Sequence, residues 1–420
     1  MKDILIKRIT NNSYLVYNPK SNIPLLFNLE EKKNFERLIK IGYISENSLH
    51  LNNECELKII NLKNELNKIG FFYVKHNLET VERDIASIKQ SARKRVYLHV
   101  TDRCNLKCSY CFNEYHRKNF FDLSFNEWKI IINKIKDSIG TLVITGGEPF
   151  LYKDLNRLIK YILKTCKNIR IECFTNGNIN FTKNNKENFE TISLIDKLNI
   201  SCDNVTNDDH ERLGFSMLIF ENNIKWILEN GFGSKTSINS VISKGKLSLV
   251  KSVQEYAYNK GLEFIFAIHL PKNKGDRNNM LSISDYKKII KEDFLKTKNV
   301  IKAENIPYTV KCSASSAIIS VDSHGNCYPC QNFHFPEFKM GNLLTHSFED
   351  INNSNISKLL KNHHILKVEG CKDCELRFVC GGGCLADTYK IHGRIDVKPE
   401  IMCPYYKIAS IQRLVEIEYD

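Results

Sequence analysis

Three closely spaced cysteines, Cys104, Cys108 and Cys111, directly follow an apolar, strand-like run that ends at Thr101. Three thiolates can hold only three irons of a [4Fe–4S] cluster, so the CxxxCxxC spacing leaves the fourth iron open to another ligand. The position just after a strand is where α/β barrels carry their chemistry. A zinc knuckle or scattered free thiols are the alternatives, but the three-residue spacer is less usual for zinc and a knuckle does not follow a strand in this way. The run therefore predicts an iron–sulfur site at one end of a barrel.

The region from about 95 to 300 alternates β-rich runs with helical patterns. This alternation is typical of parallel βα units, in which functional residues lie just after each strand. The sequence thus predicts an α/β domain with six strands, at Val96–Thr101, Thr141–Thr145, Ile169–Thr175, Leu198–Cys202, Thr236–Ile242 and Leu262–Leu270.

A short Gly-Gly-Glu-Pro motif, Gly146, Gly147, Glu148 and Pro149, follows the second of these strands. Glycines allow a close approach of the backbone to a ligand, and the carboxylate can accept hydrogen bonds from an ammonium group. By itself the motif could be a turn. One βα unit after CxxxCxxC, however, it resembles the signature of the radical S-adenosylmethionine (SAM) enzymes. That resemblance implies a partial (β/α)6 barrel, a [4Fe–4S] cluster whose open iron chelates SAM, and a GGEP motif that binds the SAM amino group.

Further SAM contacts are implied by the same resemblance. Thr175–Gly177 is similar to the family's TNG turn, and the stretch with Ser201 and Asp203 is similar to its SLDG motif. The resemblance also assigns SAM contacts to Arg212 and Tyr110. The segment around Arg212 is one residue shorter than the family form HDxxRG. Packing of the cluster loop is an alternative role for Tyr110.

A second group of cysteines lies between about 305 and 410. Its spacing resembles the SPASM domain, which implies two auxiliary [4Fe–4S] clusters. By position, one cluster would be held by Cys371, Cys374, Cys380 and Cys403, and the other by Cys312, Cys330 and Cys384. Cys327 is an extra cysteine, which either completes the second cluster or is a spare thiol that leaves the site open for a substrate group. One or two zinc sites are the alternative for this region.

The N-terminal segment, residues 1 to 85, has three short β-type runs followed by two helical patterns. The expected strands are Ile4–Ile9, Ser13–Asn18 and Pro24–Asn28, the expected helices Glu30–Ile39 and Glu54–Leu66, and a last apolar run over 70–74 predicts a strand or wing. The order resembles the small winged-helix-like domains that bind the leader of a precursor peptide as an added strand. A structural cap on the barrel is the alternative.

Composition and charge indicate the class of protein and the cellular compartment in which this chemistry would take place. The 420 residues are 42% hydrophobic and 26% charged, which is typical of a globular protein of two or three domains. No membrane span or signal peptide is predicted, so we expect a cytoplasmic protein. In that compartment fifteen cysteines favour metal binding over disulfides. The net charge of +13 is spread along the chain, which favours solvated helix faces; attraction to an acidic peptide is the alternative, and no nucleic-acid-binding motif is found.

The resemblance implies a reaction as well as a fold. Reductive cleavage of SAM gives a 5′-deoxyadenosyl radical that takes a hydrogen atom from the substrate, and the SPASM clusters can accept the electron released afterwards. We expect a maturase that forms a thioether in a ribosomally made precursor peptide; other crosslinks and epimerisation stay open. The expected partners are that peptide with its leader, and an electron donor such as flavodoxin or ferredoxin.

Two other functions are considered. A sulfatase-maturing enzyme would carry an Asp base directly after Cys330, where this chain has Gln331, which cannot act as a base. A non-catalytic iron–sulfur electron carrier would not need the GGEP motif.

Overall fold

A computed structural model describes residues 4–41, 54–73, 79–83, 93–111, 121–206, 211–271, 274–291, 301–302, 308–415 and 417–418. The chain divides into two compact units, and each is discontinuous in sequence. One unit, here called the barrel unit, holds Ile88–Ser282 and Ser313–Asn362; the other, here called the terminal unit, holds Met1–Ser87, Ile283–Cys312 and His363–Asp420. The predicted ranges 1–85, 95–300 and 305–410 stay a prediction. Among the described helices, none has the length and apolar character of a membrane span.

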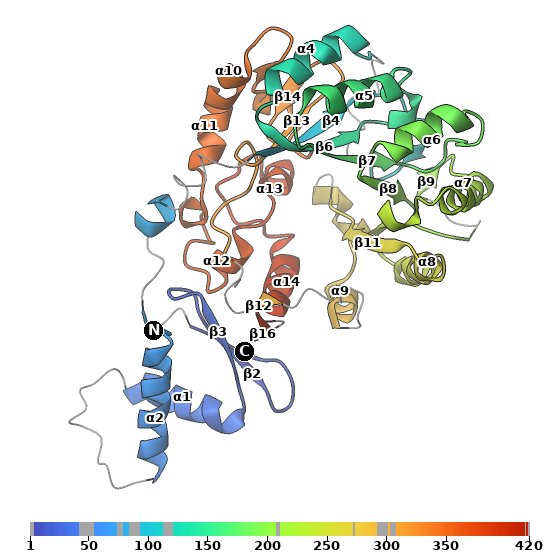
Figure 1. The fold of residues 1–420 in the computed structure, drawn as a ribbon. Coiled ribbons are helices and arrows are strands. Elements are labelled where there is room, and N and C mark those ends of the chain that lie inside the picture. The colour runs from blue at the N-terminus through green and yellow to red at the C-terminus, as the bar shows by residue number, and fades with distance from the viewer. Residues whose placement is uncertain are drawn as a thin grey trace. The chain divides into compact units, whose positions relative to one another are not determined.

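Six parallel strands form the centre of the barrel unit, and they confirm the predicted α/β fold (Figure 1). Each strand pairs with the next in chain order, as expected when every strand is followed by a crossover helix. The strands are β4 (Lys94–His99), β6 (Ile139–Thr145), β7 (Arg170–Thr175), β8 (Lys197–Ser201), β10 (Thr236–Ile242) and β11 (Glu263–Ile268).

Amphipathic helices pack against one face of this sheet. They are α4 (Phe125–Ile135), α5 (Leu155–Thr165), α6 (Asn185–Ser193), α7 (Met217–Glu229) and α8 (Leu247–Asn259). Alternate strand residues such as Val96 and Leu98 are buried in one core with helix residues such as Trp128 and Ile131. Because side chains alternate between the two faces of a strand, the residues between these positions point to the opposite face.

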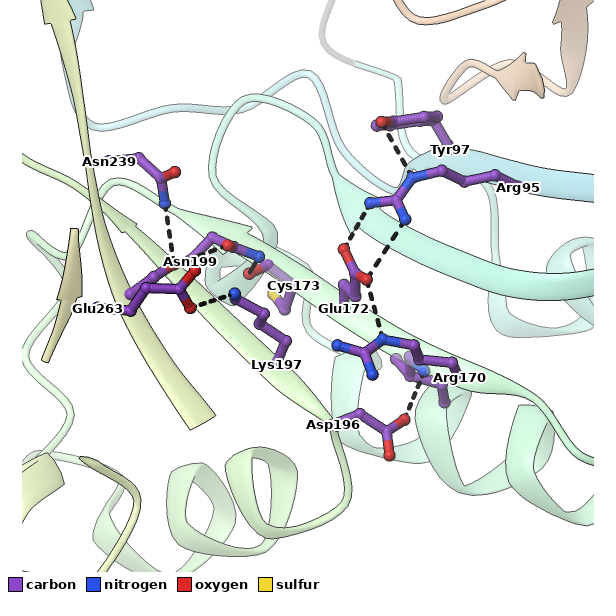
Figure 2. Close-up of polar contacts among 12 residues, drawn as sticks. Arg95, Tyr97, Arg170, Glu172, Cys173, Asp196, Lys197, Asn199, Asn239 and Glu263 are labelled. Atoms are coloured by element: carbon purple, nitrogen blue, oxygen red, sulfur yellow. Dashed lines mark hydrogen bonds and ion pairs between the residues drawn. The ribbon is translucent and has the colours of Figure 1, made fainter. Parts of the chain in front are cut away.

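That opposite face, here called the polar face, carries charged and amide side chains (Figure 2). Glu172 of β7 accepts from Arg95 of β4 at 2.5 Å and from Arg170 at 3.0 Å. Lys197 of β8 pairs with Glu263 of β11 at 2.5 Å. Burial would raise the pKa of Glu172, but the two guanidinium groups hold this pKa below its ordinary value. These contacts link the amino-terminal halves of the strands to one another.

The sheet continues beyond β4 with strands that the sequence did not predict. β13 (Ile318–Val321) runs parallel to β4, with Ser320 opposite Tyr97, and β14 (Asn326–Tyr328) and β15 (Gly341–Asn342) follow antiparallel. Two helices, α10 (Phe348–Asn353) and α11 (Asn355–Asn362), belong to the same unit. Part of the C-terminal cysteine region therefore completes the barrel sheet.

The N-terminal part of the terminal unit has the predicted strands and helices. β1 (Leu5–Arg8), β2 (Tyr14–Asn18) and β3 (Ile23–Phe27) form an antiparallel sheet, followed by α1 (Leu29–Ile41) and α2 (Glu54–Lys68). The expectation of a strand over 70–74 is wrong for its described residues, which form a turn closed by the Tyr73 amide on the Gly70 carbonyl at 2.9 Å. Phe71 explains the apolar run: it is fully buried, with its ring edge-on to Phe35 at 5.7 Å.

The same N-terminal sheet also packs against the C-terminal segment within the terminal unit. Leu15 and Tyr17 of β2 share a buried cluster with three C-terminal residues, Leu376, Val379 and Leu414. The remaining elements of this unit are α9 (Ile283–Lys291), β12 (Ile301–Lys302), α12 (Arg377–Cys380), α13 (Leu385–His392), α14 (Cys403–Val415) and β16 (Ile417–Glu418).

Candidate iron–sulfur and cofactor site

The cluster loop, residues 104–111, follows β4 and is fixed by an unpredicted strand pair. Within it, β5 (Lys107–Cys108) pairs antiparallel with β9 (Arg212–Leu213), with Cys108 opposite Arg212. The three cysteines of the loop are half-buried. Cys104 Sγ accepts from the Leu106 amide at 3.4 Å and from Asn176 Nδ2 at 3.7 Å. Hydrogen bonds to the ligating sulfurs are a common feature of iron–sulfur sites, so this loop fits a cluster.

The GGEP motif lies directly against the start of the cluster loop. The Gly147 amide donates to the Thr101 carbonyl and the Glu148 amide to the Arg103 carbonyl, both at 2.8 Å. A Cβ atom built on Gly146 would lie 2.4 Å from the Thr101 carbonyl oxygen, and a Cβ atom built on Gly147 would lie 2.2 Å from the Arg103 carbonyl oxygen. Both glycines are therefore required by contact between the two loops, in addition to any approach to a ligand.

The Glu148 side chain is fully buried, and both of its oxygens accept hydrogen bonds from the protein. The donors are the Asn176 amide at 2.7 Å, Thr175 Oγ1 at 2.8 Å and the Phe150 amide at 3.1 Å. Burial raises the pKa of Glu148 to about 7, although the three hydrogen bonds act in the opposite direction. The carboxylate thus holds the TNG turn against the start of η3 (Pro149–Leu151). Its contact with a ligand ammonium group stays a prediction.

An asparagine network, which the sequence did not predict, ties the TNG turn to the cluster loop. Asn176 Nδ2 donates to Asn105 Oδ1 at 2.8 Å, and Asn105 Nδ2 donates to the Asn178 carbonyl at 2.9 Å. Gly177 has φ = +66°, and a Cβ there would lie 2.4 Å from Ile200 Cγ2. The sequence motif indicates the TNG turn, whereas it shows Asn105 only as a spacer residue between Cys104 and Cys108.

Tyr110, Asp203 and Arg212 form one cluster beside Cys108, in which Asp203 and Arg212 are buried and Tyr110 is half-buried. Arg212 Nε donates to Asp203 Oδ2 at 2.8 Å, and the Tyr110 hydroxyl donates to the same oxygen. The guanidinium carbon lies 5.4 Å from the centre of the Tyr110 ring, and Arg212 Nη1 lies 4.0 Å from Cys108 Sγ. Burial would lower the pKa of Arg212, but the Asp203 charge raises it. A permanent cation therefore sits next to a cluster thiol, despite the shortened motif around Arg212.

Ser201 is the last residue of β8, on the polar face opposite Asn239 of β10. Within the described part of the chain, its hydroxyl has no hydrogen bond to the protein. The structure thus gathers the predicted cofactor residues at the carboxyl ends of neighbouring strands: the GGEP motif after β6, the TNG turn after β7, and Ser201 and Asp203 at the end of β8. Their direct contacts with SAM stay a prediction.

Four of the C-terminal cysteines line a single cavity in the terminal unit, Cys371, Cys374, Cys380 and Cys403. Burial, together with the nearby thiols of Cys374, Cys380 and Cys403, raises the pKa of Cys371 to about 12. In the described chain, no three His, Cys, Asp or Glu side chains converge as a single metal ion requires. A cavity lined by four cysteine thiols fits a four-iron cluster, which is larger than a single metal ion.

The other predicted ligands are divided between the two units. Cys312 and Cys384 belong to the terminal unit, whereas Cys330 belongs to the barrel unit. The set of these three stays a prediction. Cys327 is fully buried on β14 in the apolar core of the barrel unit, and this burial raises the pKa of its thiol. Gln331 has a buried side-chain oxygen without a hydrogen-bond partner among the described residues.

Comparison with protein families identifies two domains. Residues 98–246 match the radical SAM superfamily, and residues 312–375 match the SPASM iron–sulfur cluster-binding domain. Over 302 residues the chain is 26% identical to the antilisterial bacteriocin subtilosin biosynthesis protein AlbA of Bacillus subtilis (strain 168), covering 67% of this chain and 65% of AlbA. Over 323 residues it is 22% identical to the cysteine-type anaerobic sulfatase-maturating enzyme of Clostridium novyi (strain NT), covering 68% and 85%.

Solved structures share the fold. SuiB of Streptococcus suis bound to precursor peptide SuiA matches with a TM-score of 0.57 and 17% identity, over 96% of this chain and 98% of that one. The anSMEcpe enzyme with bound AdoMet and Cp18Cys peptide matches with a TM-score of 0.60 and 20% identity, over 77% and 98%. The two domains imply [4Fe–4S] clusters and SAM, which the thiol sets described above fit.

Proposed function

We propose that this chain, which joins a radical SAM domain to a SPASM domain, modifies a ribosomally made precursor peptide by forming a thioether crosslink. The observation that carries the proposal is the extent of the fold match. SuiB matches 96% of the chain, so its fold includes most of the N-terminal segment. The anSMEcpe match covers 77%, which leaves out about as much chain as that segment contains. AlbA, a subtilosin biosynthesis protein, is a relative by sequence.

The residues of the cluster loop have separate tasks in this reaction. Cys104, Cys108 and Cys111 would hold a four-iron cluster with one open iron. SAM bound there supplies a 5′-deoxyadenosyl radical when it receives one electron, which we expect from a donor such as flavodoxin or ferredoxin. Arg212 places a fixed positive charge beside Cys108, and Asp203 and Tyr110 hold that charge in position.

Glu148 is a positioning residue in this reaction. Its carboxylate fixes the TNG turn, and the Gly147 amide fixes the GGEP backbone against the cluster loop. These contacts make the cofactor pocket rigid before SAM binds, which reduces the ordering cost of binding.

The terminal unit would bind the leader of the precursor. Within the described residues, β1 and β3 each pair on one side only, so each presents a free edge to an added strand. Leu26 on β3 is 47% exposed and Leu29 at the start of α1 is 45% exposed. We place the leader at the β3 edge, where these two side chains offer apolar contacts to a peptide strand.

The terminal unit would hold one fully ligated auxiliary cluster on Cys371, Cys374, Cys380 and Cys403. The resemblance of the cysteine spacing assigns the second auxiliary cluster to Cys312, Cys330 and Cys384. We propose that Cys327 is a core thiol and ligates neither, because its apolar surroundings disfavour the thiolate that a cluster needs. Either auxiliary cluster could accept the electron released from the substrate.

Sulfatase maturation is the second candidate, favoured by the sequence match to the cysteine-type anaerobic sulfatase-maturating enzyme of Clostridium novyi. Mass spectrometry separates the two functions. The anaerobically reconstituted full-length protein is incubated with dithionite, SAM and a cysteine-containing precursor peptide with its leader. A thioether appears as loss of two hydrogens with the sulfur retained and no longer open to alkylation. A formylglycine, or no formation of 5′-deoxyadenosine, would overturn the proposal.

A further inference from the structure

A histidine and an aspartate outside the predicted site form a hydrogen-bonded pair near the cluster loop. His269 follows β11, and its Nε2 lies 2.9 Å from Asp276 Oδ2 in η5 (Lys274–Asn279). Asn279 Nδ2 donates to the other Asp276 oxygen at 2.7 Å and so fixes the carboxylate. The imidazole is nearly buried, with 5% of the residue exposed.

The pair lies at the carboxyl end of the barrel strands. The His269 amide donates to the Ile242 carbonyl at 2.8 Å, so strand pairing continues past the end of β11. Residues 263, 265 and 267 alternate with the helix-facing positions, and His269 continues that alternation on the polar face that bears Glu263 (Figure 2). Its ring is edge-on to Tyr110, with 6.3 Å between ring centres. His269 therefore neighbours a residue of the cluster loop.

The thioether reaction needs a proton acceptor, and the other site residues cannot fill that role. Asp203 already accepts from Arg212, Tyr110 and the Val241 amide, the last at 2.8 Å. Glu148 is fully buried among its donors. The Tyr110 hydroxyl donates to Asp203, and an amide such as Gln331 does not take up a proton.

We propose that His269, oriented by Asp276, accepts the proton that the peptide thiol releases when the carbon–sulfur bond forms. This inference rests on the proposed function. Because Asp276 accepts a hydrogen bond from Nε2, the neutral ring carries its proton on Nε2 and its free lone pair on Nδ1. Nδ1 is therefore the atom that accepts the proton, and Asp276 stabilises the imidazolium that results. The peptide carbon gives a hydrogen atom to the 5′-deoxyadenosyl radical, and the sulfur gives its proton to His269. The remaining electron goes to an oxidised auxiliary four-iron cluster, which balances the reaction.

The experiment compares His269→Gln with the matched control His346→Gln, an exposed histidine of the same unit. Both reconstituted proteins receive dithionite, SAM and the same cysteine-containing precursor peptide, and 5′-deoxyadenosine and crosslinked peptide are both measured. His269→Gln should form 5′-deoxyadenosine within about threefold of the wild-type rate, while crosslink per 5′-deoxyadenosine falls by about 100-fold or more, the range of a general base. An unchanged ratio, or loss of both products with the clusters intact, would overturn the proposal.

Asp276→Asn keeps the test decisive if His269→Gln fails to hold its clusters. Asp276 and Tyr110 are titratable groups that contact the imidazole in the described chain. Without the Asp276 charge the imidazolium is less stable, so the pH midpoint of crosslink per 5′-deoxyadenosine should move to lower pH. An unchanged pH midpoint in Asp276→Asn would contradict the proposed role of the His269–Asp276 pair. Failure of the proposed function itself would be seen in the wild type, as SAM cleavage without any crosslink.

Discussion

The carboxylate of Glu148 accepts a hydrogen bond from the backbone amide of Asn176 at 2.7 Å, and this joins two motifs that are 28 residues apart in the chain. The Asn176 side chain continues to Asn105 in the cluster loop. Three loops after three successive strands are therefore held together by hydrogen bonds that the sequence did not predict.

Glu148→Gln should change how stability depends on pH. Burial raises the pKa of Glu148 to about 7 from an ordinary 4.5, so the folded protein keeps a proton that the unfolded chain has released between these values. This contribution to the free energy of unfolding is complete below pH 4.5 and is lost as pH rises through 7, in total about 3 kcal/mol. Glutamine does not titrate, so the stability advantage of the wild type over the variant should shrink over that interval.

Urea unfolding of the reconstituted protein, followed by the fluorescence of Trp128 and Trp226, measures this difference, since both lie in the core of the barrel unit. Glu229→Gln on the exposed side of α7 is the matched control and should follow the wild type at every pH. Parallel pH curves for Glu148→Gln and the wild type would contradict the prediction.

Arg212→Met should destabilise the barrel unit by about 3–5 kcal/mol, because it leaves the buried Asp203 charge without its partner. The double variant Arg212→Met with Asp203→Asn should recover part of that loss but not SAM cleavage, because the cation beside Cys108 is still absent. Arg157→Met is the control: its side chain is 65% exposed, its ion pair with Asp154 spans 3.8 Å, and the cost should stay below about 1 kcal/mol. Full SAM cleavage in the double variant would refute the role of the charge.

Cys374→Ala should remove one auxiliary cluster and leave the radical SAM cluster in place. Three four-iron clusters hold about twelve irons, so the variant should retain about eight. It should still cleave SAM but form no crosslink. Cys327→Ala should retain about twelve irons, since Cys327 lies in an apolar core. Iron analysis and electron paramagnetic resonance check both variants. A loss of about four irons from Cys327→Ala would show that Cys327 is a cluster ligand.

Leu26→Asp should weaken binding of the precursor leader by about tenfold or more, because a charge replaces the 47% exposed apolar side chain on β3. Leu218→Asp, on the 71% exposed side chain at the start of α7, is the matched control. Fluorescence anisotropy of a labelled leader measures affinity, and SAM cleavage without peptide should be the same in both variants. Equal leader affinity in the two variants would place the binding site away from β3.

Much of the architecture was predictable because it is encoded locally. Each barrel strand is a β-rich run bounded by turn residues, and consecutive parallel strands joined by helices leave few possible orders. The CxxxCxxC and GGEP motifs were likewise recognisable from their spacing and from the strands that precede them. The run at Phe71 shows the limit of this reasoning, since an apolar stretch that packs in a turn has the same composition as a short strand.

The sequence by itself determined the two N-terminal helices, the six parallel strands and the residue types that resemble a radical SAM site. Only the tertiary structure decided which of these groups touch: Arg212 with Asp203, Asn105 with Asn176, His269 with Asp276, and β13 with β4. The physical reason is that periodicity records which face of an element is apolar, whereas a polar partner is chosen by distance and orientation after the chain has folded. Residues far apart in sequence carry no local sign of that pairing.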